Sequence, residues 1–268
     1  MSLSVFVLDP SRAADEVVDW GFGADTALVA GHLAGPQVAA RLRETSGEDP
    51  HLVLLHRPAQ AADAAFLANV VSGAVPAVPV SRLQVDSSLL AATVIGLEAA
   101  HVEGEGDVSR LARIEHTLAR GVGGAWLKRV TRLDSPSPSF GQHLRSIVPG
   151  GARFVARCGT EGRVERASAG GYTAQGEEQL VVGAEADHPG ARQLAAWFGS
   201  DDVVHVPPVT SDAKRLYGNP GVEFVVVREV LEPPGPGRGR CRVCRDTLHA
   251  EVCPYCHVRS QPLEVPSA

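Results

Sequence analysis

Short apolar runs alternate with longer segments of helical spacing over the first hundred residues of the chain. Four runs have the length and composition of buried strands, at residues 3–8, 26–30, 51–55 and 75–80. The segments that follow them predict helices at residues 10–18, 36–44, 60–71 and 87–101. Continuous apolar strands joined by helices are typical of a parallel sheet covered on both faces. The pattern therefore predicts an α/β fold with a doubly wound, mostly parallel sheet.

The pattern changes in the second half of the chain. An amphipathic helix at residues 108–120 is expected to end or kink at the glycines of residues 121–124. Two apolar runs then flank Gly159-Thr-Glu-Gly162, which is a hairpin signal. Further strands and one helix are expected at residues 179–185, 187–198, 203–206 and 222–231. This predicts a smaller α+β part and leaves open whether it continues the first sheet.

Two proline-rich segments have the composition of linkers. Ser135-Pro-Ser-Pro-Ser139 disfavours helix, and residues 232–239 combine prolines and glycines without an apolar anchor. We therefore expect three parts: an α/β domain at 1–134, an α+β part at 140–231 and a C-terminal module at 238–268.

Four of the five cysteines lie in the last 28 residues, as Cys241-Arg-Val-Cys244 and Cys253-Pro-Tyr-Cys256. Two C-x-x-C turns at this separation can direct four thiolates at one tetrahedral Zn²⁺. The module has few apolar residues, so metal binding would supply most of its folding free energy. A pair of redox dithiols is the alternative, and Cys158, which has no such companion, is expected to be a small buried hydrophobe.

These two knuckles resemble the zinc-ribbon family, in particular short ribbons whose second knuckle reads Cys-Pro-x-Cys. The resemblance covers residues 241–256 and implies a closed structural Zn²⁺ site. Arg245 and His257 stand where such knuckles often have glycine. His249 and His257 are the substitute ligands to consider. A site closed by four cysteines has no open position for a substrate, so we expect the ribbon to be a scaffold or a contact surface.

Charge is distributed unevenly along the chain. The formal net charge is −6, yet residues 235–268 hold five arginines against three acidic residues. An acidic body disfavours contact with nucleic acid or membranes, so we expect no membrane contact. Nucleic acid could be contacted only through the arginines of the tail: Arg238, Arg240, Arg242 and Arg245. No secretory signal is visible at residues 1–9, and cysteines in metal-ligand spacing fit a reducing compartment, so a cytoplasmic location is expected.

Polar residues follow the first and third predicted strands, where ligands bind in open α/β sheets. Asp9 and Ser11 follow the first strand, and His56 and Arg57 follow the third. As a set they could supply a base, a metal ligand and an anion clamp, although capping a helix is the commoner role for an Asp with a neighbouring Ser, as at Asp9 and Ser11.

The run at residues 49–58, with Val78-Pro-Val-Ser81 after it, resembles the third and fourth strands of response-regulator receiver domains. The resemblance covers residues 3–102 and implies a flavodoxin-like layer. His56 stands where a receiver has its phosphoacceptor aspartate, and the acidic pair after the first strand is reduced to Asp9. A degenerate, interaction-type domain is therefore implied.

Common nucleotide-binding and hydrolase motifs are absent from the sequence. Our first hypothesis is a cytoplasmic zinc-binding adaptor or regulator, whose α/β body binds a protein partner or small ligand and whose tethered ribbon is a second contact surface. The alternatives are a hydrolase or phosphate-handling transferase that uses Asp9, Ser11, His56 and Arg57, or nucleic-acid contact through the arginine-rich ribbon.

Overall fold

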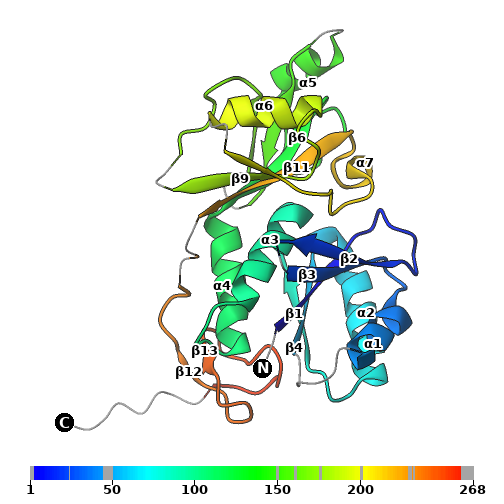
Figure 1. The fold of residues 1–268 in the computed structure, drawn as a ribbon, viewed down its shortest axis with the longest axis vertical. Helices are drawn as coiled ribbons and strands as arrows, with labels where there is room; N and C mark the ends of the chain where they lie inside the picture. Colours follow the sequence, from blue (N-terminus) through cyan, green and yellow to red (C-terminus); the bar gives the residue numbers. More distant parts are fainter. Residues whose placement is uncertain are drawn as a thin grey trace, which may run out of the picture.

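The computed structural model describes residues 3–23, 25–44, 51–148, 151–159, 162–174, 177–199, 202–228, 231 and 233–260. Within these residues the chain forms one five-stranded sheet, one six-stranded sheet and a two-stranded ribbon. The two larger sheets lie one above the other along the long axis of the molecule, and the ribbon lies at the lower end (Figure 1). The predicted α/β class is confirmed.

The first sheet has the strand order β2-β3-β1-β4-β5. Its strands are β1 (Leu3–Leu8), β2 (Val17–Phe22), β3 (Asp25–Ala30), β4 (His51–His56) and β5 (Val80–Gln84). All neighbouring pairs are parallel except β2 and β3, which run antiparallel. The four parallel strands have the spatial order β3-β1-β4-β5. Numbered along the chain among themselves, this is 2-1-3-4, the order of flavodoxin-like sheets. The expected mostly parallel sheet is therefore present.

Helices cover both faces of this sheet. Alternate residues of β1 point to opposite sides, so Phe6 and Leu8 pack in the cluster that includes α1 (Gly35–Glu44) and α2 (Ala61–Ala74). Val5 and Val7 pack in the cluster on the other face, with α3 (Leu89–Ala100) and α4 (Asp107–Arg120). A short 3₁₀ turn, η1 (Pro58–Gln60), leads from β4 into α2. The doubly wound arrangement follows from the two apolar faces.

Two predicted elements of this layer were wrong. The helix expected at residues 10–18 is replaced by turns and by β2, whose Trp20 is buried and donates its Nε1–H to the Pro207 carbonyl oxygen. The strand expected at residues 75–80 lies at β5 instead. In the first case a contact with a distant segment decides the local structure, which no local pattern reports.

The second sheet has the order β10-β9-β11-β6-β7-β8 and is antiparallel except where β10 meets β9. Its strands are β6 (Val122–Leu127), β7 (Phe154–Arg157), β8 (Arg163–Arg166), β9 (Glu178–Val182), β10 (Val203–His205) and β11 (Gly221–Arg228). The accompanying helices are α5 (Phe140–Ile147), α6 (Pro189–Phe198) and α7 (Ala213–Tyr217). The second part is thus a separate sheet, and it takes β6 from within residues 1–134.

The glycines expected to stop α4 are part of β6. A Cβ added to Gly124 would lie 1.9 Å from the Ala156 carbonyl oxygen, and one on Gly123 would lie 2.7 Å from the Ala91 side chain. Both positions therefore need glycine because a neighbouring strand and helix approach closely.

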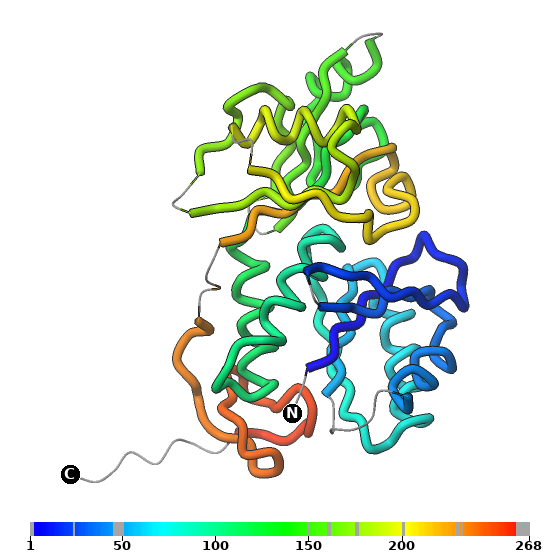
Figure 2. The backbone as a smooth tube through the Cα atoms, viewed as in Figure 1, coloured from blue at the N-terminus to red at the C-terminus, as the bar shows by residue number. Residues whose placement is uncertain are grey.

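Helix α3 joins the two sheets. Ten of its twelve residues are buried, and its apolar side chains share one cluster with Val5 and Val53 of the first sheet and Val181 and Val225 of the second. A helix that is apolar all round is typically buried on every side. The molecule is thus held together by a helix that both sheets cover (Figures 1 and 2).

The cysteine module is docked on the body, against the expectation of a tethered ribbon. Its strands β12 (Gly239–Arg240) and β13 (Thr247–Leu248) pair antiparallel. Leu248 and Tyr255 are buried in the same cluster as Val108 and Leu111 of α4. The Asp246 carboxylate accepts a hydrogen bond from the Val108 backbone N–H at the start of α4. Apolar packing and helix capping therefore fix the module to the end of α4.

No helix among the described residues has the length and apolar content needed to cross a membrane.

Candidate functional site

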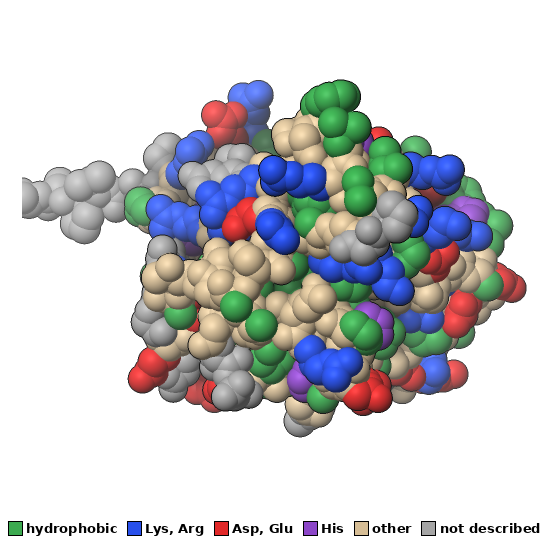
Figure 3. Space-filling model, turned by 90° about the horizontal axis from the view of Figure 1, so that it is seen from above, with side chains coloured by type: hydrophobic (Ala, Val, Ile, Leu, Met, Phe, Trp, Pro, Cys, Tyr) green, Lys and Arg blue, Asp and Glu red, His purple; other side chains and the backbone are tan. Residues whose placement is uncertain are grey.

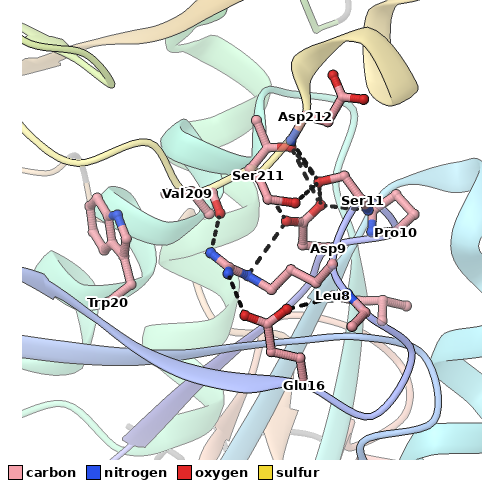
Figure 4. Close-up of polar contacts among 12 residues, drawn as sticks. Leu8, Asp9, Pro10, Ser11, Glu16, Trp20, Val209, Ser211 and Asp212 are labelled. Carbon is pink, nitrogen blue, oxygen red and sulfur yellow. Dashed lines mark hydrogen bonds and ion pairs between the residues drawn. The ribbon is translucent and has the colours of Figure 1, made fainter.

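Asp9 and Ser11 lie at the carboxyl end of β1, where the two sheets meet (Figure 4). The Asp9 carboxylate is fully buried and accepts hydrogen bonds from the backbone N–H and the hydroxyl of Ser11, at 2.9 and 2.6 Å. It also accepts from the Thr210 hydroxyl at 3.4 Å and the Ser211 backbone N–H at 3.1 Å. The Arg12 guanidinium lies 3.6 Å from it and donates to the Val209 carbonyl oxygen. Asp9 therefore fastens residues 209–211 to the first sheet.

The Ser11 hydroxyl lies among three neighbours from the distant segment. It is 3.0 Å from the Thr210 hydroxyl oxygen and 2.9 Å from that of Ser211, and it accepts from the Asp212 backbone N–H at 3.0 Å. With its proton directed at Asp9, this oxygen is fully engaged in fixed contacts. The sequence predicted these two residues as catalytic candidates, and the structure gives both a role in joining the sheets.

His56 and Arg57 occupy the end of the neighbouring strand β4 and point elsewhere. The buried His56 ring places Nδ1 3.0 Å from the Arg57 carbonyl oxygen, and burial lowers its pKa below the usual 6.5. The Arg57 guanidinium lies over the Tyr217 ring, 5.2 Å from its centroid. Among the described residues no hydrogen bond or ion pair joins His56 to Asp9. The two pairs of residues thus have separate partners among the described residues.

A buried acidic residue that the sequence analysis missed lies nearby. Glu223 of β11 accepts hydrogen bonds from the backbone N–H groups of Leu89 and Leu90 at the start of α3, and from the Tyr217 hydroxyl. Burial raises the pKa of its carboxyl above the usual 4.5. A single acidic residue inside the apolar run of residues 222–227 was the available signal. Its contacts satisfy donors at a helix terminus that would otherwise be buried unpaired.

The four cysteines of the C-terminal module come together as the sequence predicted. Their sulfur atoms all lie within 4.8 Å of one another, with Cys244 and Cys253 3.9 Å apart. Four sulfurs around one Zn²⁺ at the usual bond length of about 2.3 Å would be about 3.8 Å apart, so the cluster fits a tetrahedral metal ion. Among the described residues this is the one such group of ligands. The four residues form a site that can hold a metal ion.

The residue after each knuckle adopts the backbone conformation that favours glycine, although neither residue is glycine. Arg245 and His257 have φ angles of 66° and 54°, in the left-handed region that glycine adopts without strain. The knuckle turns are thus formed despite the substitution. The predicted substitute ligand His249 instead places its ring nitrogens near the Gly235 carbonyl oxygen and the Ser109 hydroxyl.

A cavity of about 400 Å³ lies where α3 and α4 meet the second sheet. Its volume is within the range of small-molecule sites, about 300–1,000 Å³. Apolar side chains form one part of the lining: Ile95, Val122, Val226, Val227 and Leu231. Charged side chains form another part: Arg120, Arg157, Arg163, Arg228 and Glu178. The lining thus contains both apolar side chains and several arginines.

Aromatic and acidic contacts hold the charged lining in place. Tyr172 donates its hydroxyl proton to Glu178 at 2.8 Å, and Arg228 lies 3.2 Å from the other oxygen of that carboxylate. The Arg157 guanidinium lies 5.9 Å from the centre of the Tyr172 ring. Burial, and then Glu178, raise the pKa of Tyr172 to about 12, so the ring stays neutral. Glu165 pairs with Arg157 and Arg163 behind the lining, so four arginines stand against two carboxylates, and the positive excess makes the cavity suited to an anion.

One polar atom near the cavity has no partner of its own. The hydroxyl oxygen of Thr117, a lining residue on α4, is buried and forms no hydrogen bond with the described residues. Most buried hydroxyl groups are paired with protein or with a ligand or water. Sequence reasoning missed the whole cavity because its lining comes from nine segments between residues 95 and 231.

Comparisons with known proteins give a result only at the level of structure. No protein-family model matches the chain, and no curated protein matches it, so neither resemblance stated above has a family match. A DegV family protein from Corynebacterium glutamicum superposes with a TM-score of 0.53 at 17% identity, covering 87% of this chain and 99% of that one. The chain has the fold of DegV family proteins. A second DegV-fold structure, from Streptococcus agalactiae, has a TM-score of 0.51 at 12% identity and covers 86% of this chain and 100% of its own.

The DegV fold overturns the function expected from the sequence. The Streptococcus agalactiae protein is described as a fatty acid binding DegV family protein, whereas we expected an adaptor with a tethered zinc ribbon. The adaptor hypothesis was wrong: the ribbon is part of the packed body, and nearly the whole chain superposes on these folds. The hydrolase or transferase alternative stays a prediction, and Asp9 and His56 have separate hydrogen-bond partners in the structure.

The arginines of the tail were expected to reach a partner. Arg238, Arg240, Arg242 and Arg245 are all exposed. Contact with nucleic acid through these side chains, or with a protein partner, stays a prediction.

Proposed function

We propose that this protein binds a fatty acid, or a similar anion with an apolar chain, in the cavity lined by four arginines. The observation that carries the proposal is the cavity itself: about 400 Å³, lined by valine, isoleucine and leucine side chains together with four arginines. A fatty acid divides in the same way into an apolar chain and a carboxylate. The shared fold with a fatty acid binding protein supports the assignment.

The apolar part of the lining would hold the acyl chain. Burying methylene groups contributes about 0.8 kcal/mol each, so a chain needs only partial burial for useful affinity. Val226 and Val227 at the end of β11 and Ile95 of α3 come from rigid elements that the core already fixes. A site on such elements is preformed, which reduces the entropy cost of binding.

The arginines would hold the carboxylate. Arg157 is oriented by Tyr172 and lies within 3.4 Å of Glu165, and Arg163 lies 2.6 Å from the same Glu165 oxygen. Arginine is well suited to a carboxylate because its planar group donates two parallel hydrogen bonds. The unpartnered Thr117 hydroxyl could donate a further hydrogen bond to the ligand.

Titration calorimetry of the full chain with oleate below its micellar concentration tests the proposal. We expect saturable binding, weakened about tenfold by Arg157→Gln, because a hydrogen bond to a charged group contributes about 1.5–3 kcal/mol before solvent screening. Val227→Phe, which fills the apolar part, should weaken binding as well. Arg242→Gln, an exposed arginine of the ribbon, is the matched control. Equal affinity in all variants, or no binding by the unmodified protein, would overturn the proposal.

We also propose that Cys241, Cys244, Cys253 and Cys256 bind one structural Zn²⁺. The sulfur separations and the two knuckle turns support zinc, since four thiolates in tetrahedral geometry are its usual structural ligand set. Bound there, the ion would hold the two knuckles together and so keep the ribbon folded against α4. Metal analysis of the purified chain tests the assignment, and its prediction is argued below.

A further inference from the structure

Helix α5 presents an apolar face to solvent at the end of the molecule away from the ribbon (Figure 1). Phe140, Leu144, Ile147 and Val148 are 77%, 52%, 60% and 59% exposed. Among the described residues, they belong to the small group of large apolar side chains that are exposed to solvent. At about 100° per residue their spacing places them on one side of the helix and its end.

The opposite side of α5, which is polar, faces the protein. Gln142 donates from Nε2 to the Val164 carbonyl oxygen of β8 at 2.7 Å, and Ser146 is buried. The helix begins at Ser139 with a capping box formed with Gln142. A surface helix normally turns its apolar side to the core, so the arrangement in α5 is inverted. These contacts orient the exposed face outward, and the packing of the described residues does not explain it.

The segment that contains α5 is basic, in contrast to the chain as a whole. Residues 128–153 hold five basic side chains and one acidic one, a local formal charge of +4, while the whole chain carries −6. The basic residues are Lys128, Arg129, Arg132, Arg145 and Arg153. Seen from this end of the molecule, hydrophobic side chains lie among Lys and Arg side chains (Figure 3).

We infer that the apolar face of α5 docks on an anionic lipid surface. Exposed Phe, Leu and Ile side chains on a helix with basic residues around them are suited to the boundary between acyl chains and acidic headgroups. A second copy of this chain is disfavoured because pairing the faces would bring two basic segments toward each other. The expected absence of membrane contact rested on the charge of the whole body, and this end has the opposite sign.

Sedimentation with vesicles tests the inference on the full chain, with no fatty acid added. Vesicles of phosphatidylcholine with phosphatidylglycerol should carry the protein into the pellet, and vesicles of phosphatidylcholine alone should carry much less. The double variant Phe140→Ser/Ile147→Ser should lower the partition coefficient about tenfold or more, because each substitution removes a large apolar side chain from the lipid. Val243→Ser, at a residue 65% exposed on the ribbon, is the matched control. Arg145→Glu should weaken only the binding that depends on phosphatidylglycerol.

Each contrary outcome has a distinct meaning. If the unmodified protein stays in solution with anionic vesicles, or if the double variant sediments like the control, the inference is wrong. A dimer in analytical ultracentrifugation that the double variant abolishes would show that the face joins two copies instead. The cavity variant Arg157→Gln should sediment with vesicles like the unmodified protein, so failure of ligand binding and failure of docking are separable.

Discussion

Glu223 in β11 accepts a hydrogen bond from the backbone N–H of Leu89 in the first turn of α3, with an N···O distance of 3.0 Å. The contact places a carboxylate from the second sheet at the positive end of a helix that packs on the first. The same carboxylate accepts from the Leu90 N–H and from the Tyr217 hydroxyl. One side chain therefore satisfies three donors where the two halves of the molecule meet.

Removing this carboxylate should destabilise the protein strongly. Glu223→Ala leaves the Leu89 and Leu90 amides and the Tyr217 hydroxyl buried without partners, at about 1–3 kcal/mol for each donor. We expect a loss of about 3 kcal/mol or more in the free energy of unfolding, measured by urea denaturation. Glu251→Ala, at an exposed carboxylate of the ribbon, should change it by less than about 0.5 kcal/mol.

The same residue predicts a pH dependence. Burial raises the pKa of Glu223 in the folded state above the usual 4.5, so the folded state favours the protonated form. The stability linked to this group is therefore present below pH 4.5 and is lost as the pH rises through the raised pKa. Relative to Glu223→Gln, which cannot titrate, the unmodified protein should become less stable across that window. A difference between the two that is independent of pH would contradict the assignment.

Asp9 makes a second contact between the two halves of the molecule. We expect its negative charge to contribute more to the stability of the fold than its volume does. Asp9→Asn keeps the volume but places an amide beside donors and removes the anion that faces Arg12, whose side chain is 11% exposed. Breaking a buried ion pair on one side costs about 3–5 kcal/mol. We expect Asp9→Asn to lower the free energy of unfolding, measured by urea denaturation, by about 3 kcal/mol. Asp63→Asn, on the exposed side of α2, is the control. An unchanged stability would show that Asp9 does not fasten residues 209–211.

The sequence predicted those parts of the structure that depend on local pattern. The strands and helices of residues 26–71 and 87–120 follow from apolar spacing, and the ligand set Cys241, Cys244, Cys253 and Cys256 follows from motif spacing. The helix predicted at residues 10–18 was wrong because Trp20 and Arg12 bind carbonyl oxygens of residues 207–209, about 190 positions away. Gly123 and Gly124 were interpreted as a helix stop signal. They are glycine because α3 and β7 approach them closely, and that approach is not visible in the local sequence.

The candidate site was harder to predict for the same reason. Arg120, Arg157, Arg163 and Arg228 have no common motif. The antiparallel pairing of the second sheet brings Arg157, Arg163 and Arg228 to one cavity, and the end of α4 adds Arg120. The residues at the strand ends, Asp9 and His56, were conspicuous in the sequence, yet their contacts are internal. Chemistry at a strand end is thus weak evidence until the neighbouring elements are known.

Removal of the metal should release the ribbon from α4. We expect one zinc per purified chain, lost in Cys253→Ser and kept in Cys158→Ser, since Cys158 is buried elsewhere with burial raising its pKa to about 12. Few apolar residues hold the ribbon together, so without metal it should unfold and expose α4. Elemental analysis and the rate of trypsin cleavage after Arg240 and Arg242 would report both effects. A ribbon equally resistant in chelator would show that apolar packing alone fixes it.

The two strained knuckles predict a stabilising substitution. Arg245 has a φ angle of 66°, where a residue with a side chain costs about 1–2 kcal/mol and glycine costs almost nothing. Arg245→Gly should therefore raise the melting temperature of the metal-loaded protein, although the more flexible unfolded chain offsets part of the gain. Arg242→Gly, at a residue outside the left-handed region in the same knuckle, should lower it. Both variants remove one positive charge from the same turn, so electrostatics cancel in the comparison and the difference isolates backbone strain. Equal effects of the two substitutions would show that the turn stores no strain at Arg245.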